Sequence, residues 1–123
     1  MSRTTDEGGS GGRPPRELLT VEVVELTAER LRVIATAKRI ALLDRLKDGE
    51  MGVQELADCV GLAHQNASHH LALLWRAGIL TRRREGPMTL YAIEDWTAWW
   101  VIEQIADLVG SLREEPGGAP PAE

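Results

Sequence analysis

Residues 53–78 read VQELADCVGLAHQNASHHLALLWRAG, and this stretch decides the fold. Its first eight residues, Val53 to Val60, have the apolar spacing of a short helix. Gly61 ends that helix, because glycine accepts the left-handed conformation of a tight turn. A second helix over about His64 to Ala77 follows and stops at Gly78. Two short helices joined by such a turn are typical of a helix-turn-helix.

The apolar positions of these two helices favour a close crossing. A tight helix pair needs a small residue on one helix and apolar side chains on the other. Ala57 is the small residue of the first helix, and Ala67, Leu71 and Leu74 form the apolar face of the second. The sequence therefore predicts that these four residues belong to the core.

A β-hairpin is predicted next. Two runs with strand character, Ile79 to Arg84 and Met88 to Ile93, flank the turn residues Glu85-Gly86-Pro87. The order helix, helix, strand, strand is that of a winged helix-turn-helix. We therefore expect a mainly α fold with a two-stranded β-hairpin wing.

Helices are also predicted on both sides of this unit. Apolar residues recur at helical spacing from Ala28 to Lys47, and the preceding residues 18–26 are ambiguous, although we favour a helix starting near Leu18. In the last helix, Glu94 to Leu112, apolar positions cover about half the circumference, more than the ~100° stripe needed to pack on one core. A second surface is therefore needed, and the same helix of another subunit provides it in an α-helical dimer interface.

The two ends of the chain differ from the rest. Residues 1–16 and 113–123 are rich in Gly, Pro and charge, so we expect disordered tails around a domain at 17–112. Neither a membrane span nor a signal-peptide pattern is present, so we expect a cytoplasmic protein. Cys59 is the only cysteine, which excludes an intrachain disulfide and a cysteine-cluster metal site.

Charge is unevenly distributed along the chain. The net charge is −5, which by itself disfavours a nucleic-acid partner. Residues 60–93 nevertheless carry four Arg and one Glu, whereas residues 94–112 carry four acids and no base. A polyanion would therefore be attracted to the segment that holds the second helix and the hairpin.

Several motifs in this order resemble the ArsR/SmtB family of bacterial winged-helix repressors. They are AERLRVIATAKRIALLDRL, VQELADCVGL, ASHHLALLWRAGIL and TRRREGPMTLYAI, and the resemblance extends over about Ala28 to Leu112. The resemblance implies that the helix from His64 to Ala77 enters the DNA major groove, with His70 packed beneath it. The residues placed toward DNA are Gln65, Asn66, Ser68 and His69. Their chemistry agrees, because Asn and Gln pair with adenine and Ser suits a base or a phosphate.

The basic first arm of the hairpin is the second predicted contact. Arg82, Arg83 and Arg84 alternate along a strand, so only one or two of them can reach the DNA backbone or minor groove. The alternative is a solvated strand edge. Family members commonly carry more basic residues after the hairpin glycine, where this chain has Pro87 and Met88.

No metal, cofactor or catalytic site is predicted. The helix carrying His64, His69 and His70 has no acid or cysteine to complete a zinc site. Metal-sensing relatives use positions that correspond to Gly52 and Gln54, or a set on the last helix of which only Asp95 matches. Asp95 is better explained as an acid at a helix N-terminus. A serine and a histidine adjacent on one helix do not face each other, so an enzyme is not expected.

The remaining candidates are an aromatic group and the single thiol. Trp96 and Trp100 project onto the polar side of the last helix, and Trp99 onto its apolar side. The three tryptophans either contact the first helix or partner subunit, or form a wall for a small-molecule effector. Cys59 is interpreted as a small packing residue, with an intersubunit redox disulfide as the alternative.

These observations predict a homodimeric transcriptional repressor. Two recognition helices would enter successive major grooves of an imperfect palindromic operator in double-stranded DNA, and dimerisation would set their spacing. The competing hypothesis is a winged-helix protein-interaction module without DNA binding, which the acidic ends of the domain favour.

Overall fold

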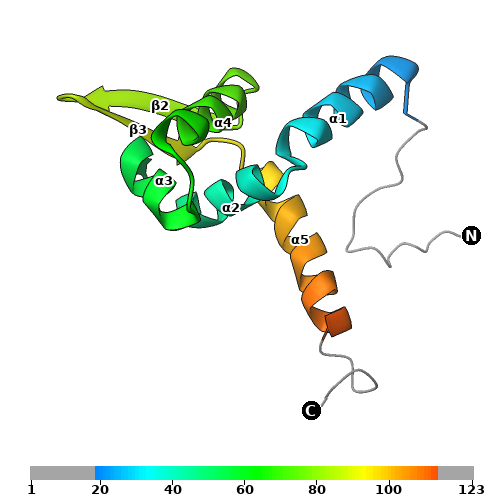
Figure 1. The fold of residues 1–123 in the computed structure, drawn as a ribbon. Coiled ribbons are helices and arrows are strands. Elements are labelled where there is room, and N and C mark those ends of the chain that lie inside the picture. Colours follow the sequence, from blue (N-terminus) through cyan, green and yellow to red (C-terminus); the bar gives the residue numbers. More distant parts are fainter. Residues whose placement is uncertain (1–18, 114–123) are drawn as a thin grey trace, which may run out of the picture.

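The computed structural model describes residues 19–113, and Figure 1 shows their arrangement. The hairpin lies at one end of the molecule, and the first and last helices extend from the other. The elements, in chain order, are α1 (Val21–Ile34), α2 (Ala37–Leu46), β1 (Met51–Gly52), α3 (Val53–Val60), α4 (His64–Arg76), β2 (Leu80–Glu85), β3 (Met88–Ile93) and α5 (Trp96–Arg113). Within 19–113, none of the helices combines the length and apolar character that crossing a bilayer requires.

The predicted tails fall almost entirely outside the described residues. Residues 1–16 and 114–123 are not described, so the disorder predicted for them stays a prediction. Arg113 was assigned to the C-terminal tail, but it is the last residue of α5. The final helix is therefore one residue longer at this end than the sequence pattern predicted.

Two helices, α1 and α2, account for the helical spacing predicted from Ala28 to Lys47. The break lies at Ala35 and Thr36, because the Thr36 hydroxyl accepts a hydrogen bond from the Arg39 amide at 3.2 Å and starts a new helix. The ambiguous segment 18–26 is helical from Val21, where the Thr20 hydroxyl caps α1. The helical alternative was therefore right, with a later start than Leu18.

The helix-turn-helix has the predicted boundaries. α3 runs from Val53 to Val60, and Gly61 follows in the left-handed conformation with φ = 71°. α4 begins at His64 and is followed by Gly78 at φ = 82°. Both glycines occupy a conformation that a side chain disfavours, so they end the helices where the sequence predicted.

The predicted two-stranded wing is confirmed as the β2–β3 hairpin, and a short third strand, β1, which was not predicted, joins it in one sheet. β3 lies in the centre, with β2 and the short β1 antiparallel on either side. Glu85 pairs with Met88, so only Gly86 and Pro87 form the loop. The two-residue strand β1 is too short to show the alternation that identifies a strand. We use "wing" for the β2–β3 hairpin.

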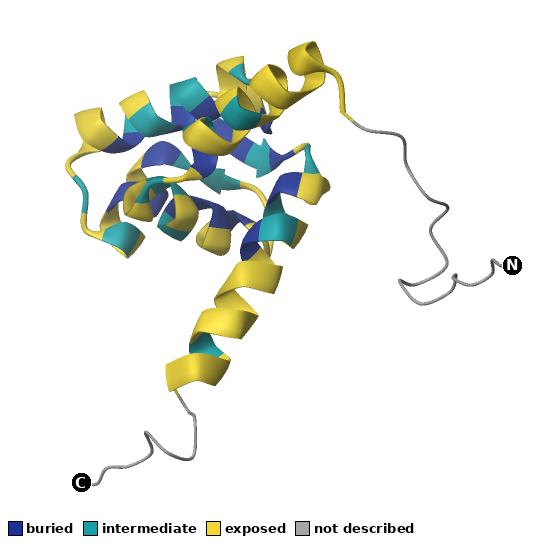
Figure 2. Cartoon of the chain, turned by 90° about the vertical axis from the view of Figure 1, so that its right-hand side faces the viewer, coloured by how far each residue is buried: buried dark blue, intermediate teal, exposed yellow. Residues whose placement is uncertain are grey.

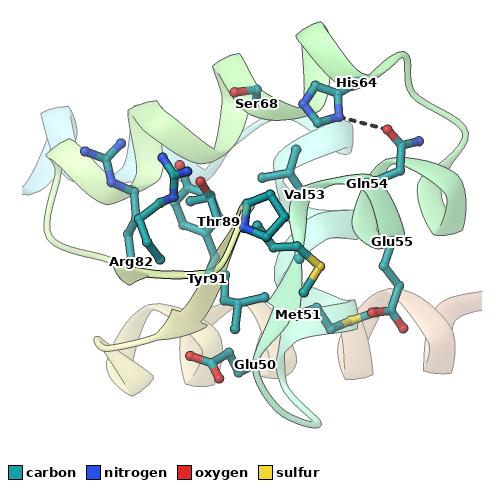
Figure 3. A pocket seen from close by; sticks show the side chains of 15 residues that line it. Glu50, Met51, Val53, Gln54, Glu55, His64, Ser68, Arg82, Thr89 and Tyr91 are labelled. Carbon is teal, nitrogen blue, oxygen red and sulfur yellow. Dashed lines mark hydrogen bonds between the residues drawn. The ribbon is translucent and has the colours of Figure 1, made fainter.

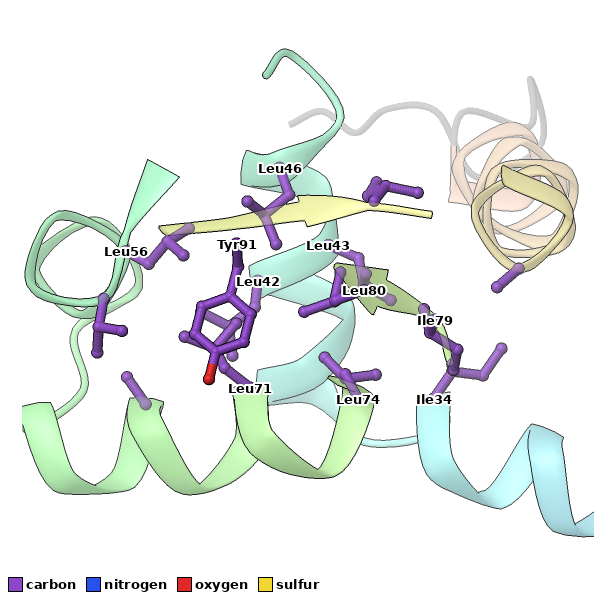
Figure 4. Close-up of a cluster of buried hydrophobic side chains, with 14 of the residues drawn as sticks. Ile34, Leu42, Leu43, Leu46, Leu56, Leu71, Leu74, Ile79, Leu80 and Tyr91 are labelled. Atoms are coloured by element: carbon purple, nitrogen blue, oxygen red, sulfur yellow. The ribbon is translucent and has the colours of Figure 1, made fainter. Parts of the chain in front are cut away.

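The core lies between α2, α3, α4 and the sheet (Figure 4). All four helix-turn-helix residues predicted to be buried, Ala57, Ala67, Leu71 and Leu74, are fully inaccessible to solvent. Small side chains on α3 and α4 let these helices approach closely, and the large leucines fill the space beneath them. The core therefore holds α4 against the body through one face only.

The terminal helices bury much less of their apolar surface (Figure 2). Ile34 is the only buried residue of α1, and Ala98 and Ile102 are the only ones of α5. We define the terminal apolar faces as the aliphatic residues of these helices that are about half-exposed or more, which are Val21, Val24, Leu26, Ile105, Leu108, Val109 and Leu112. The wide apolar arc predicted for the last helix therefore has one covered side and one exposed side.

Candidate nucleic-acid interface

A groove of about 680 Å³ separates α4 from the wing, with the start of α3 between them (Figure 3). α4 lines it with His64 and Ser68, and β2 lines it with Arg82 and Arg84. The other lining residues come from 50–55 and 87–91. The groove therefore brings together polar and cationic side chains from the two elements that the sequence singled out.

The polar residues of α4 lie on the side away from the core. Gln65, Asn66 and His69 are exposed and Ser68 is half-buried. At 100° per residue these positions cover less than half of the helix, opposite the buried Leu71. The N-terminal half of α4 therefore presents hydrogen-bonding groups to solvent as one continuous surface.

The N-terminus of α4 also has amide donors without a side-chain cap. Ala63 occupies the N-cap position, and no side chain caps the first turn. The amides of a first helical turn have no partner inside the helix, and together they carry a partial positive charge. This end of α4 therefore favours an anionic group.

His64 is fixed by a contact with α3. Its Nδ1 lies 2.8 Å from Oε1 of Gln54, and the Gln54 amide nitrogen donates to Asp58 at 2.9 Å. Because the Gln54 oxygen can only accept, Nδ1 of His64 carries the proton and donates. This pair joins the two helices at the edge of the groove.

His70 lies on the side of α4 that faces α2, where it is half-buried. Nε of Arg39 donates to Nδ1 of His70 at 3.1 Å, and the Arg39 guanidinium also donates to the Val33 carbonyl. Burial lowers the pKa of His70, and the nearby charges of Arg39, His69 and Lys38 lower it further. His70 is therefore neutral, and it serves to attach α4 to α2.

The three wing arginines divide between two faces of the strand. Arg82 and Arg84 line the groove, whereas Arg83 projects to the other side and binds Glu50, with two N–O distances of 2.8 Å. This hydrogen bond lowers the pKa of Glu50, against a smaller opposing effect of burial. Period-two alternation explains the division.

Comparisons with known proteins agree with this geometry. A family model described as a helix-turn-helix domain matches residues 34–83. The chain is 35% identical over 82 residues to the transcriptional repressor SmtB of Mycobacterium tuberculosis, and the match covers 67% of this chain and 57% of SmtB. It is 33% identical to the arsenic resistance regulator ArsR1 of Pseudomonas putida, covering 80% of this chain and 73% of ArsR1. The chain belongs to the ArsR/SmtB family.

A solved ArsR-type structure confirms the winged helix-turn-helix fold. The homodimeric winged helix-turn-helix DNA-binding domain of Mb0332 from Mycobacterium bovis superposes with a TM-score of 0.67 at 25% identity. The superposition covers 76% of this chain and 86% of that domain. The family resemblance noted in the motifs from Ala28 to Leu112 is therefore confirmed by both sequence and structure.

Asp95, the last-helix position that matches a ligand of metal-sensing ArsR/SmtB members, has other contacts here. Oδ2 of Asp95 accepts two hydrogen bonds from Arg30, and Oδ1 accepts from the amides of Thr97 and Ala98. Burial raises the pKa of Asp95, but the bonds from Arg30 and these amides outweigh it, so the pKa is lowered overall. Asp95 thus caps α5, as predicted. Within 19–113, no three His, Cys, Asp or Glu side chains are grouped to hold a metal.

The tryptophans and the thiol lie in different surroundings. Trp99 packs against the core, with the Lys47 ammonium 5.8 Å from its ring centre. Trp96 and Trp100 are 52% and 55% exposed, so α1 does not cover them. An effector wall built from these residues stays a prediction. Cys59 is exposed, so its interpretation as a packing residue was wrong.

Sequence reasoning missed four residues that organise this region. The first is Trp75, whose ring stacks on Arg82. The other three form hydrogen bonds with residues discussed above: Glu50 with Arg83, Arg39 with His70 and Arg30 with Asp95. Trp75 could have been found, because it lies three helical turns after His64 on the face that lines the groove. The other three make contacts between distant parts of the chain, which local spacing does not reveal.

Proposed function

We propose that this chain is a homodimeric ArsR-type transcriptional repressor that binds an imperfect palindromic DNA operator through α4 and the wing. The residues of α4 that meet base edges and phosphates are Gln65, Asn66, Ser68 and His69. The N-terminal residues of a recognition helix occupy this position in the major groove. The backbone of the same DNA segment lies along the groove, between α4 and the wing.

One observation carries the proposal. Arg82 and Arg84 of the wing and Ser68 and His64 of α4 line one groove, although the two elements are separate in sequence. Binding to phosphate is driven by cationic side chains, and hydroxyl and imidazole groups add hydrogen bonds to its oxygens. These four side chains suit a polyanion, in a chain whose net charge is −5.

The terminal apolar faces support the homodimer. Leu108 and Leu112 are 59% and 63% exposed on α5, and Val21 is 75% exposed on α1. Apolar patches on helical surfaces mark interaction sites, and the related Mb0332 domain is homodimeric. A twofold dimer places two copies of α4 at a fixed separation, which matches the two half-sites of a palindrome.

Arg83 has a smaller part in this proposal than the sequence predicted. Its guanidinium already forms hydrogen bonds with Glu50 and with Glu85, at 2.8 Å and 3.2 Å. A phosphate contact by Arg83 requires this ion pair to open. We therefore assign the wing contacts to Arg82 and Arg84.

Binding of the full chain to DNA from upstream of its own coding region tests the proposal. A labelled duplex of that region and a scrambled duplex of equal composition are titrated between about 50 and 200 mM salt. We expect preferential binding to the upstream duplex, with an affinity that falls steeply as salt rises. Equal, weak binding to both duplexes would contradict it.

A matched pair of substitutions separates DNA binding from the alternative of a protein-interaction module, which the acidic net charge of −5 favours. Arg84→Gln removes a groove-lining charge, and Arg83→Gln removes the adjacent charge on the other face of β2. We expect Arg84→Gln to lower affinity and to reduce the salt slope by about one for each phosphate that the variant no longer binds. Arg83→Gln should change both much less. A module without DNA binding would show no difference between the two variants.

A further inference from the structure

Arg82, which lines the groove, is stacked on Trp75, which is not one of the lining residues. The guanidinium carbon of Arg82 lies 3.6 Å from the ring centre of Trp75. Trp75 is near the end of α4, on the same helical face as His64 and Ser68. The stack therefore connects the C-terminal part of α4 to β2 beside the groove.

Arg82 differs from its neighbour Arg83 in how it is held. Arg83 donates to Glu50 and Glu85, so its hydrogen-bond donors are engaged by carboxylates. In the part of the chain that the structure describes, the ion pairs involve neither Arg82 nor Arg84. Arg82 is therefore fixed by an aromatic face and keeps its charge uncompensated.

Stacking on an aromatic ring suits a guanidinium that must bind an anion. The ring contacts the flat face of the guanidinium, while its N–H donors point outward in the plane and match the oxygens of a phosphate. A long side chain that is already ordered loses less conformational entropy on binding. Trp75 thus prepares Arg82 for a phosphate without consuming any donor.

We propose that Trp75 is a positioning residue, which holds the Arg82 guanidinium at the groove so that it binds a phosphate of the DNA backbone there. This inference rests on the proposed function, since the phosphate belongs to the operator. Trp75 acts through Arg82. The effect of replacing Trp75 must therefore depend on whether Arg82 is present.

A double-mutant cycle in DNA binding tests this dependence. The full chain and the variants Trp75→Leu, Arg82→Gln and the double variant are titrated with the labelled upstream duplex. We expect Trp75→Leu to weaken binding about two- to fivefold. The double variant should bind no more weakly than Arg82→Gln alone. Trp75→Phe, which keeps an aromatic face, should recover part of the loss.

The neighbouring arginine provides the control. In the cycle of Trp75→Leu with Arg84→Gln, the fold losses of DNA affinity from the two substitutions should multiply, because Arg84 is not in the stack. Thermal unfolding of each variant identifies a general loss of structure, and binding to the scrambled duplex identifies a general loss of DNA affinity. If Trp75→Leu unfolds, Trp75→Phe provides the second test of the inference. If the losses from Trp75→Leu and Arg82→Gln multiply as well, the inference is wrong while the proposed function stands. If the wild-type chain binds neither duplex, both are wrong.

Discussion

The helix-turn-helix with its wing buries its apolar side chains, whereas the two terminal helices leave many of theirs exposed. Leu56, Leu71 and Leu74 in the first region are completely buried, whereas Leu108 and Leu112 on α5 are 59% and 63% exposed. Leucine occurs in both regions, so composition does not explain the difference. The first region buries its apolar side chains within one chain, whereas the apolar side chains of the second need another surface to cover them.

Replacing Leu71 by alanine tests the first half of this comparison and has the largest expected effect. Leu71 is on the buried face of α4 and is completely inaccessible to solvent. Its loss removes buried apolar area and leaves a cavity, which costs about 2–5 kcal/mol of unfolding free energy. Denaturant unfolding measures this cost. The difference in unfolding free energy between Leu71→Ala and wild type should not depend on protein concentration.

Leu108→Ala is the matched variant in the second region. Its side chain is 59% exposed in one chain, so truncation should cost little if the chain acts alone. In a dimer that covers this face, the cost should be visible as weaker association in sedimentation equilibrium and as a destabilisation that grows when the protein is diluted. A Leu108→Ala variant that unfolds and sediments as wild type does at all concentrations would contradict an interface at this face.

Arg30→Met tests the connection between the two regions and has an intermediate expected effect. Arg30 extends from α1 and donates to Asp95 at the start of α5 and to the Ala77 carbonyl at the end of α4, at 2.6 Å and 2.7 Å. These bonds are partly exposed, so we expect a loss of about 1–2 kcal/mol of unfolding free energy. Arg32→Met, on the exposed side of the same helix, should cost much less. Equal losses would show that the contacts of Arg30 do not connect the regions.

Local sequence was sufficient for most of the backbone. The positive-φ glycines Gly61 and Gly78 ended α3 and α4 where the pattern predicted, because their effect depends only on the chain around them. The apolar period of Leu71 and Leu74 likewise identified the buried face of α4. These features depend only on residues close together in the chain, so they can be predicted from the sequence alone.

Contacts between distant residues account for what was missed. β1 exists only because Met51 and Gly52 pair with β3, about forty residues later in the chain. The ion pair of Arg83 was missed for the same reason, since its partner Glu50 lies 33 residues before it in the chain. Alternation of the wing arginines was predictable, but which of them faced the groove depended on how the hairpin twists and packs.

The smallest expected effect concerns the pH dependence of stability through His70, which fastens the first region to α2. Arg39 donates to Nδ1 of His70, so this nitrogen must be unprotonated in the folded chain. Burial and the charges of Arg39, His69 and Lys38 lower the pKa of His70 from its ordinary value of 6.5. Well above pH 6.5 the histidine is neutral in both folded and unfolded chains, and it adds no pH dependence there.

As the pH falls through 6.5, the unfolded chain binds a proton on His70 before the folded chain does. Protonation therefore favours unfolding, and stability decreases until the pH is below the lowered pKa of the folded state. Unfolding midpoints measured between about pH 7 and pH 5 should fall more steeply for wild type than for His70→Asn, whose amide oxygen can accept from Arg39 but does not titrate. His69→Asn removes one of the charges that lower the pKa of His70, so its slope should lie between those of wild type and His70→Asn. If His70→Asn keeps the wild-type slope, the neutral His70–Arg39 contact does not make the stability depend on pH.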